Sequence, residues 1–290
     1  MRIQHNVSAM FALRQIAINQ QLCAKSIRRL SSGYRINCAA DDPAGLAVSE
    51  KMRAQIRGLD VAQRNTQEGI DLIQTAEGNL NETHSILQRM KELATQSANG
   101  TYQNDTDRKN SSKEFDALKQ ELDRIANSTK FNGISLLNGN LEEKPNKKGG
   151  MTLQVGTDSS AASQYTFYIP NMGTKGLGID GASIGTQQDA RSTIDLIQKA
   201  IDTVSGARAD LGAAQNGLNY TLSNLDTMQE NLISAESRIR DVDVAKEMME
   251  LTKHEILVQV GMAMLAQANL QPRNILKLLD DMIGPNNRYH

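Results

Sequence analysis

The chain is poor in aromatic residues, which limits the kind of core it can build. Phe, Trp and Tyr together make up 3% of its 290 residues, and Trp is absent. Large compact cores usually take much of their buried area from aromatic rings. Burial must therefore come from Leu, Ile, Val, Met and Ala, which suit long helices packed side by side.

The chain also lacks an excess of charge of either sign. Charged residues are 22% of the sequence, yet the net charge is −1. This balance fits solvated helix faces and gives no electrostatic reason to expect nucleic acid as a partner.

No apolar run reaches the roughly 18–20 residues that a membrane-spanning helix needs. No apolar signal-peptide core follows Met1 either. We therefore expect no membrane partner, and a chain that is either cytosolic or exported without a cleaved signal.

Cysteine is scarce as well, with only Cys23 and Cys38. Two cysteines are too few for a disulfide framework. Cys23 falls on an apolar stripe, where a small buried residue is expected. Cys38 lies in a turn-like stretch and is expected at the surface.

Catalytic patterns are missing too. Asp241, Asp243 and Glu247 form an acidic cluster, but on a predicted helix start they favour the helix dipole rather than a metal. The glycine-rich residues 173–185 lack the Gly-Lys-Ser/Thr ending of a phosphate loop and are predicted to form a surface loop. The histidines have no second metal ligand or nucleophile at the required spacing. We expect no catalytic residue, no cofactor, no metal and no enzymatic activity.

What the chain does have is a heptad pattern at each end. Apolar residues recur at steps of four and three, which places a stripe on one side of a helix. Two such helices, each needing a partner, favour pairing with each other and with neighbouring molecules. Gln20 and Glu255 interrupt the stripes, so a partner helix fits better than a lipid surface. The predicted assembly seam comprises Leu13, Ile16, Ile27, Leu30, Met248, Leu251, Val258 and Leu265.

The first helices follow from their stop and start signals. A helix over residues 1–30 is predicted to end at Gly33. Pro43, preceded by Asp41 or Asp42 as a cap, predicts a second helix that continues to about residue 99. At about 1.5 Å per residue this helix would be roughly 80 Å long.

Shorter elements follow in the middle of the chain. A third helix is predicted over 107–127. Asn-Gly pairs at 132–133 and 138–139 predict tight turns, and strands are predicted at 134–137, 151–155 and 165–169.

Helical periodicity returns over 189–234 and again from 237 to 268, with an interruption near Pro272 and a continuation to Leu279. The predicted fold is mainly α: an elongated rod of long antiparallel helices, with paired terminal coiled-coil helices and a small β-hairpin region. The predicted domains are an inner coiled-coil domain (1–43 and 237–290) and a rod domain with the β region (44–180 and 181–236).

Several motifs resemble those of one family. LSSGYRIN at 30–37, ADDPAGLAVS at 40–49 and IQTAEG at 73–78 closely resemble the N-terminal signature of bacterial flagellins. ESRIRDVD at 236–243 and AMLAQAN at 263–269 resemble the C-terminal signature. The resemblance covers about 1–140 and 185–279, in the right order.

The resemblance implies a structural subunit of an extracellular flagellar filament, with terminal helices that form its inner coiled-coil layer. Only a short segment separates the strands from the return helix, which implies a flagellin without outer variable domains. Export through the flagellar type III apparatus would explain the missing signal. The implied partners are further copies of the chain, the export chaperone, and the cap and junction proteins.

The resemblance also implies recognition by animal sensors. LQRMKELA at 87–94 matches the segment contacted by the flagellin-sensing Toll-like receptor, so Gln88, Arg89, Leu93 and Glu114 are the expected contact residues. The leucine-rich end, with Leu276, Leu278 and Leu279, is the expected region for the chaperone and for cytosolic NAIP-type sensors.

The chain departs from the family pattern in its continuation through 280–290 and in Gly261-Met262. A hook-filament junction protein, which shares flagellin-like ends, is the alternative.

Overall fold

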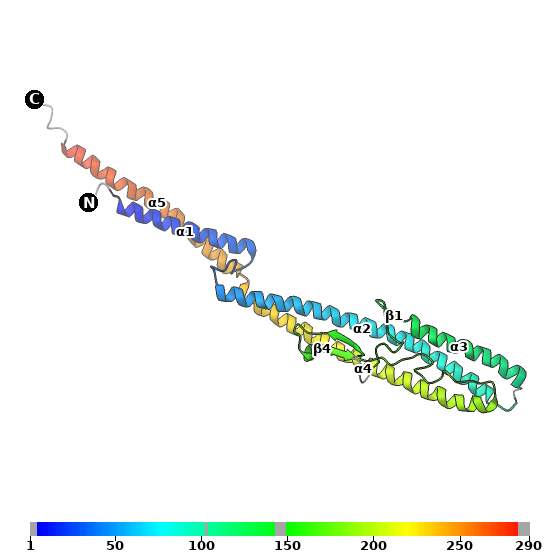
Figure 1. The fold of residues 1–290 in the computed structure, drawn as a ribbon. Coiled ribbons are helices and arrows are strands. Elements are labelled where there is room, and N and C mark those ends of the chain that lie inside the picture. The colour runs from blue at the N-terminus through cyan, green and yellow to red at the C-terminus, as the bar shows by residue number, and fades with distance from the viewer. Residues whose placement is uncertain (1–4, 102–103, 143–148, 284–290) are drawn as a thin grey trace, which may run out of the picture. The chain divides into compact units, whose positions relative to one another are not determined.

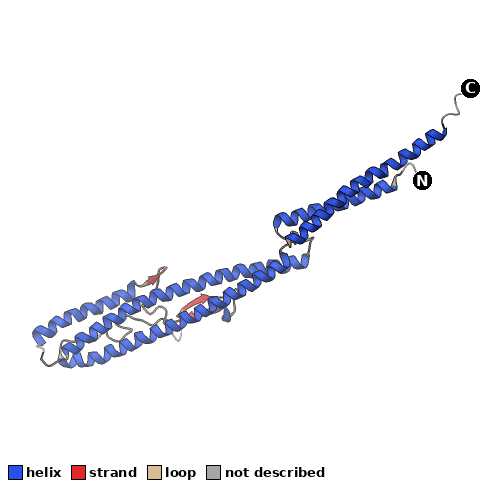
Figure 2. Cartoon of the chain, turned by 180° about the vertical axis from the view of Figure 1, so that it is seen from behind, coloured by secondary structure: helices blue, strands red, loops and turns tan. Residues whose placement is uncertain are grey.

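Long helices dominate the fold, and strands are confined to two short antiparallel pairs (Figures 1 and 2). The structure, a computed structural model, describes residues 5–101, 104–142 and 149–283. The predicted mainly α class with a small β region is confirmed. The chain forms two compact units: a terminal unit, Met1–Arg53 with Leu232–His290, and a central unit, Ala54–Asn231.

The division between the units falls within two long helices. α2 (Pro43–Ser97) enters the central unit after Arg53, and α4 (Gln187–Arg240) leaves it after Asn231. The domain boundaries predicted at 43/44 and 236/237 lie near the start of α2 and the end of α4. They remain a prediction.

The terminal unit contains α1 (Val7–Ser32) and α5 (Val244–Ile283), which run side by side and antiparallel (Figure 1). The side chain of Asn6 caps the start of α1 by accepting a hydrogen bond from the backbone N–H of Ala9. Gly33 ends it with a left-handed φ of 75°, which costs least without a Cβ. The predicted helix stop at Gly33 is confirmed.

The start of the last helix differs from the prediction. Residues 237–240 belong to α4, and the helical path breaks at 241–243 before α5 begins. The Asp243 carboxylate accepts a hydrogen bond from the backbone N–H of Lys246 at 3.1 Å and so caps α5. The predicted single helix from 237 was wrong because this local cap ends the continuity.

The predicted interruption near Pro272 was also wrong, since α5 continues through it. Proline has no N–H to donate to the carbonyl four residues earlier, here that of Ala268. The side chain of Asn6 donates to that carbonyl instead, at 2.8 Å. A residue of α1 therefore satisfies the group that Pro272 leaves without its helical partner.

The central unit is built on α2 and α4, which run antiparallel. Lys91 Nζ donates to Gln198 Oε1 at 2.6 Å, and Glu77 pairs with Arg208 at 3.6 Å. α3 (Lys109–Ser128) follows a short π-helical turn (Asn104–Arg108) and returns along α2. The apolar faces of the three helices form one core. Its fully buried members include Ile73, Leu80, Leu87, Met90, Phe115, Leu122, Ile197, Val204 and Leu218.

The first strand pair is a tight hairpin. β1 (Lys130–Phe131) pairs with β2 (Ile134–Ser135). Asn132 and Gly133 connect them with positive φ angles of 46° and 81°, as a two-residue turn of type I′ requires. The turn was predicted, whereas β1 was not. Two residues are too few to show the alternation of apolar and polar side chains by which a strand is predicted.

The second pair, β3 (Met151–Gln154) and β4 (Gln164–Phe167), packs between α2 and α4. An added Cβ at Gly69 of α2 would collide with the side chain of Leu153, so the missing side chain makes room for the hairpin. Gly217 of α4 likewise makes room for Tyr165, whose side chain lies close to where a Cβ at Gly217 would otherwise be.

The predicted surface loop at 173–185 was wrong in part, because its apolar side chains are buried. Ile179 and Ile184 are 0% exposed. Thr174 is buried too, and its backbone N–H and hydroxyl both donate to the carboxylate of Asp123 on α3. These contacts join the segment to the core. The many glycines of the segment favoured the prediction of a surface loop.

Candidate assembly and receptor-contact surfaces

The contact face of α1 against α5 follows a heptad spacing, but one half of the predicted seam is displaced by one residue. The shielded positions on α1 include Ala9, Ala12, Ile16, Asn19, Cys23, Ser26 and Leu30. Those on α5 include Glu247, Leu251, His254, Val258, Gly261, Leu265 and Ala268.

Small and polar residues thus alternate with apolar ones across the pair. Ile16 is 8% exposed and faces Gly261, where an added Cβ would lie 2.8 Å from its Cγ1. Arg29 and Glu247 form an ion pair of 3.5 Å toward the other end. The close approach at Gly261 explains how two helices with so few large contact residues pack together.

The predicted seam residues divide into two groups. Ile16 is buried, and Leu30, Leu251, Val258 and Leu265 are half-buried between the two helices. The others point away from the pair: Leu13 is 60%, Ile27 53% and Met248 48% exposed. In a single copy these three cannot seal α1 against α5, and their role as contacts between copies stays a prediction.

The outer faces of the pair carry many large apolar side chains that have no cover in the single chain. On α1 they are Val7, Met10, Phe11, Leu13, Ile18, Leu22 and Ile27. On α5 they are Val244, Met248, Met249, Ile256, Leu257, Val260, Met262, Met264, Leu270 and Leu276. Together these two sets are called the outer apolar surface below. On α5 they lie around the part of the helix that does not face α1, a pattern typical of helices that are largely surrounded by protein.

The leucine-rich end of α5 is described in part. Leu276 is 54% exposed. The side chains of Leu278 and Leu279 lie outside the described residues, as do residues 284–290.

The two segments that connect α1 and α5 to their neighbouring helices are joined through Tyr34, a feature that the sequence did not reveal. Tyr34 forms a backbone bridge with Asp241. The guanidinium carbons of Arg240 and Arg53 lie 4.9 Å and 5.3 Å from its ring centroid. Arg53 also donates to the Tyr34 hydroxyl at 3.0 Å and pairs with Glu236 at 3.0 Å. We call this group the Tyr34 clasp.

The cysteines lie close to where they were predicted. Cys23 is half-buried on the α1–α5 face, and Cys38 is exposed. Cys38 Sγ donates to Asp41 Oδ2 at 3.4 Å, and Lys25 pairs with Asp41 at 2.8 Å. The hydrogen bond from Lys25 holds the pKa of Asp41 well below its usual range.

The predicted receptor-contact region lies on the central unit, where α2 meets α3. Arg89 of α2 is half-exposed and donates to Glu114 of α3 at 3.0 Å and to Glu92 at 3.0 Å. The hydrogen bond with Glu114, and then that with Glu92, raises the pKa of Arg89 above its ordinary value. Gln88 is exposed beside them and contacts the ring of His84 at 2.9 Å.

Leu93 does not share this exposure. It is 2% exposed and belongs to the core cluster. In the single chain its side chain is covered by its own protein, and its expected contact with the receptor stays a prediction. The sequence resemblance identified the position but not the direction of the side chain.

A shallow polar groove lies next to this region. Its lining comes from α2 and α4: Gln88, Lys91, Glu92, Thr95, Gln96, Asn99, Gln198 and Ile201. The groove contains amides and hydroxyls but no pairing of a nucleophile with a base.

Within the described ranges, no group of three or more His, Cys, Asp or Glu side chains could hold a metal ion. Asp241 and Asp243 lie in the break before α5, and Glu247 pairs with Arg29. Among the described helices, none combines the length and apolar character that a bilayer crossing requires.

Comparison with known proteins identifies the family. Residues 3–142 match the bacterial flagellin N-terminal helical region, and residues 194–279 match the C-terminal helical region. The chain is 47% identical to the flagellin of Bacillus subtilis, over 96% of this chain and 100% of that protein. It is 44% identical to flagellin FlaB1 of Treponema pallidum, with the same coverage of both.

One solved structure of low sequence identity agrees with the fold, and another is similar in sequence over part of the chain. A flagellar hook-associated protein described from Vibrio parahaemolyticus is 15% identical with a TM-score of 0.57, covering 69% of this chain and 100% of that one. The crystal structure of Bacillus cereus flagellin is 34% identical, covers 56% of this chain and 88% of that one, and has a TM-score of 0.46. Both flagellin regions, in order and with matching terminal helices, show that the chain belongs to the bacterial flagellin family.

Proposed function

We propose that this chain is exported and polymerises into the flagellar filament, and that the outer apolar surface of α1 and α5 forms the contacts between copies. The observation that carries this is the exposure of seventeen large apolar side chains on these two helices, seven on α1 and ten on α5. Such a surface in water favours association.

The magnitudes agree with assembly. Fully burying a Leu, Ile, Val, Phe or Met side chain stabilises by about 1.5–3 kcal/mol. Burying about five of them contributes roughly 8–15 kcal/mol, which is comparable with the ~4–15 kcal/mol that association costs. The outer apolar surface has seventeen such side chains, each partly exposed, so burying most of them can drive polymerisation.

The occupant of this surface is a second copy of the same chain. Relatives from Treponema that are 44% identical over their full length are named flagellar filament core proteins. The heptad spacing of α1 and α5 further favours helices of the same kind over a lipid surface.

Purified full-length chain, mixed with short filament seeds, tests the proposal. We expect long filaments by electron microscopy, and α1 and α5 that are cleaved by protease in the monomer but protected in the polymer. Equal cleavage in both states would contradict the assigned surface. Short caps on hook-like ends without elongation would favour the junction protein instead.

We also propose that Arg89, Glu114 and Gln88 form part of a surface read by the host flagellin-sensing Toll-like receptor. Support comes from the exposed Arg89–Glu114 pair, which presents both charges where α2 meets α3. Leu93, buried beneath them, would position this segment.

The double variant Arg89→Ala/Glu114→Ala is expected to weaken binding of the monomer to the receptor ectodomain by about tenfold or more. The matched control is Arg124→Ala/Glu121→Ala, which removes an exposed pair from α3 alone. Equal affinities for the two double variants would remove Arg89 and Glu114 from the site.

The exposed Leu276 supports a last proposal, that the C-terminal end of α5 is bound by the export chaperone and by NAIP-type sensors. Leu276→Ala is expected to weaken chaperone binding. The control is Leu270→Ala, six residues earlier on α5, which is expected to bind nearly as well as the original chain.

A further inference from the structure

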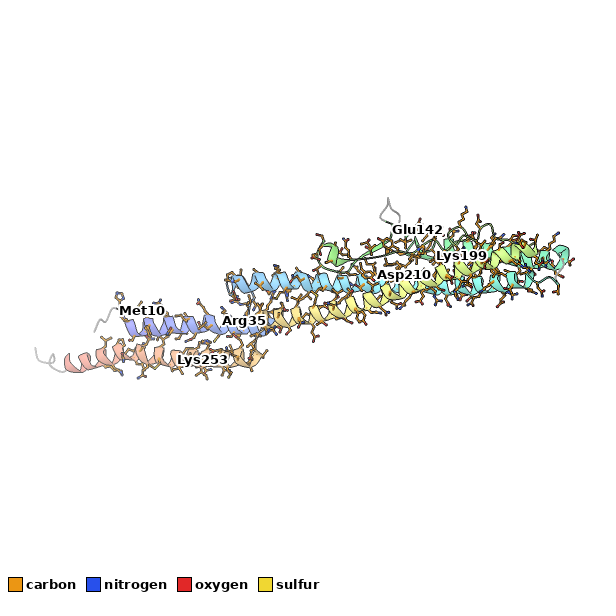
Figure 3. All side chains as sticks on the ribbon, turned by 90° about the horizontal axis from the view of Figure 1, so that it is seen from below. Met10, Arg35, Glu142, Lys199, Asp210 and Lys253 are labelled. Carbon is orange, nitrogen blue, oxygen red and sulfur yellow. The ribbon has the colours of Figure 1, made fainter. Side chains whose placement is uncertain are left out.

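The outer apolar surface has an unusual chemical composition, because five of its seventeen members are methionines. They are Met10, 64% exposed, Met248, 48%, Met249, 67%, Met262, 51%, and Met264, 59%. Met10 lies on the side of α1 that faces away from α5 (Figure 3). The other four are distributed along α5.

The central unit treats methionine differently. Met90 and Met172 are 0% and 1% exposed and belong to its core. Met228 of α4 is the exception, at 50% exposure. Met52 and Met151 are half-buried. Among the described residues, the chain therefore contains buried methionines that oxidants cannot easily reach, and Met228 is the exposed methionine outside the outer apolar surface.

Exposure matters because a thioether reacts with hydroperoxides. The sulfur donates an electron pair to one peroxide oxygen and the O–O bond breaks. The second oxygen leaves, after proton transfer, as water from hydrogen peroxide or as an alcohol from an organic hydroperoxide. Sulfur is oxidised by two electrons and the peroxide is reduced. The product, methionine sulfoxide, replaces a flexible apolar side chain by a polar one.

We propose that these five methionines are oxidation sites at which a hydroperoxide makes the unassembled subunit unable to join a filament, while burial between copies protects the subunits already assembled. This rests on the proposed role of the outer apolar surface in polymerisation. A sulfoxide oxygen there would be buried without a hydrogen-bond donor, which is unfavourable. Sulfoxide reductases reverse the reaction, so the block is reversible.

The test treats the full-length monomer with hydrogen peroxide and locates sulfoxides by peptide mass spectrometry. We expect the five surface methionines and Met228 to react at similar rates, and Met90 and Met172 much more slowly. Treatment of preformed filaments should leave the five methionines largely unmodified. Equal modification of these five in monomer and filament would overturn the protection.

The oxidised monomer is then added to untreated seeds. We expect elongation to slow by about tenfold or more, since each sulfoxide would bury an unpaired polar group between copies. Incubation with both sulfoxide reductases and a thiol reductant, which supplies the two electrons for each sulfoxide, should restore it. Normal elongation by monomer oxidised at all five positions, or no recovery after repair, would overturn the proposal.

A variant with all five methionines replaced by leucine assigns the effect to these positions, because Leu and Met are similar in volume. It should elongate normally both before and after peroxide treatment. The Met228→Leu variant should elongate normally before treatment and lose elongation after it, like the original chain. An equal loss of elongation by both variants after peroxide treatment would overturn the assignment to these five positions. If the five-fold variant fails to elongate untreated, the repair experiment on the original chain decides.

The proposed function has a separate readout in the same series. Untreated chain that neither elongates seeds nor protects α1 and α5 from protease contradicts the assembly surface, and the oxidation proposal falls with it. Untreated chain that elongates, with peroxide-insensitive growth, contradicts only the oxidation proposal.

Discussion

The terminal and central units bury their apolar residues in opposite ways. In the central unit the helices share one core, and among its described residues the exposed large apolar side chains are Val61, Ile134, Tyr168, Tyr220 and Met228. Along the whole of α1 only Ile16 and Ser26 are buried. The central unit therefore has the contacts of a protein that folds alone, while the terminal pair has those of a helix layer that still needs neighbours.

The largest effect should come from charging the outer apolar surface. Leu13→Asp is expected to abolish seeded elongation, because an unpaired carboxylate would be buried between copies. The isolated monomer should keep its helical circular dichroism, since Leu13 is 60% exposed there. Leu13→Met, which keeps the apolar volume, should elongate. Filament growth by Leu13→Asp would show that this side chain stays in solvent after assembly.

Truncation in the core of the central unit should be felt by the monomer itself. Leu87 is 0% exposed, so Leu87→Ala should lower the free energy of unfolding of the central unit by about 2–5 kcal/mol. Leu13→Ala, on the terminal pair, should change the unfolding of the monomer by less than about 0.5 kcal/mol. Urea titrations measure the free energy of unfolding of both variants. Similar decreases in the two would contradict the difference between the units.

Two glycines sharpen the comparison further. Gly261→Ala would press a Cβ against Ile16, so we expect it to loosen the α1–α5 pair by about 1–3 kcal/mol. Gly206→Ala, inside α4 with nothing within 4 Å, should instead stabilise the central unit by about 0.5–1 kcal/mol. Hydrogen exchange of α1 and α4 measures both. Recovery of the pair in Ile16→Ala/Gly261→Ala would confirm the steric cause.

The smallest effect concerns Asn6 and Pro272. Asn6→Asp keeps a good helix cap but loses the donor to the Ala268 carbonyl, and should weaken the pair by about 1 kcal/mol. In a Pro272→Ala background the helix can satisfy that carbonyl itself, so the same change should have little effect. A double-mutant cycle on α1 hydrogen exchange measures the coupling, and additive effects would contradict it.

The sequence predicted the long helices and their caps well, because Gly33, Pro43 and the heptad spacing are local signals. It placed Ile16, Leu30, Leu251, Val258 and Leu265 on the contact face. Every second predicted position was displaced by one residue. A heptad pattern can step by four and then three residues, or by three and then four, and both orders repeat every seven residues. Choosing the larger side chains, such as Leu13 and Met248, selected the outer surface instead of the contact face.

Features that depend on residues far apart in the chain could not be predicted. The burial of 173–185 depends on Asp123, and the continuity of α5 at Pro272 depends on Asn6. The Tyr34 clasp needs Arg53 and Arg240 to meet around one ring. The burial of Leu93 depends on the packing of three helices, which no motif records.

The close approach of Ile16 and Gly261 also determines which alignment of the terminal helices is correct. Two helices with a seven-residue apolar repeat could shift along one another by one repeat, and their contact faces would still be opposite each other. After such a slip Ile16 would stand opposite His254 or Ala268, and Gly261 would leave a gap beside Ala9 or Cys23. One missing side chain thus makes a single register the best packed, and every copy can present the same surface to the next.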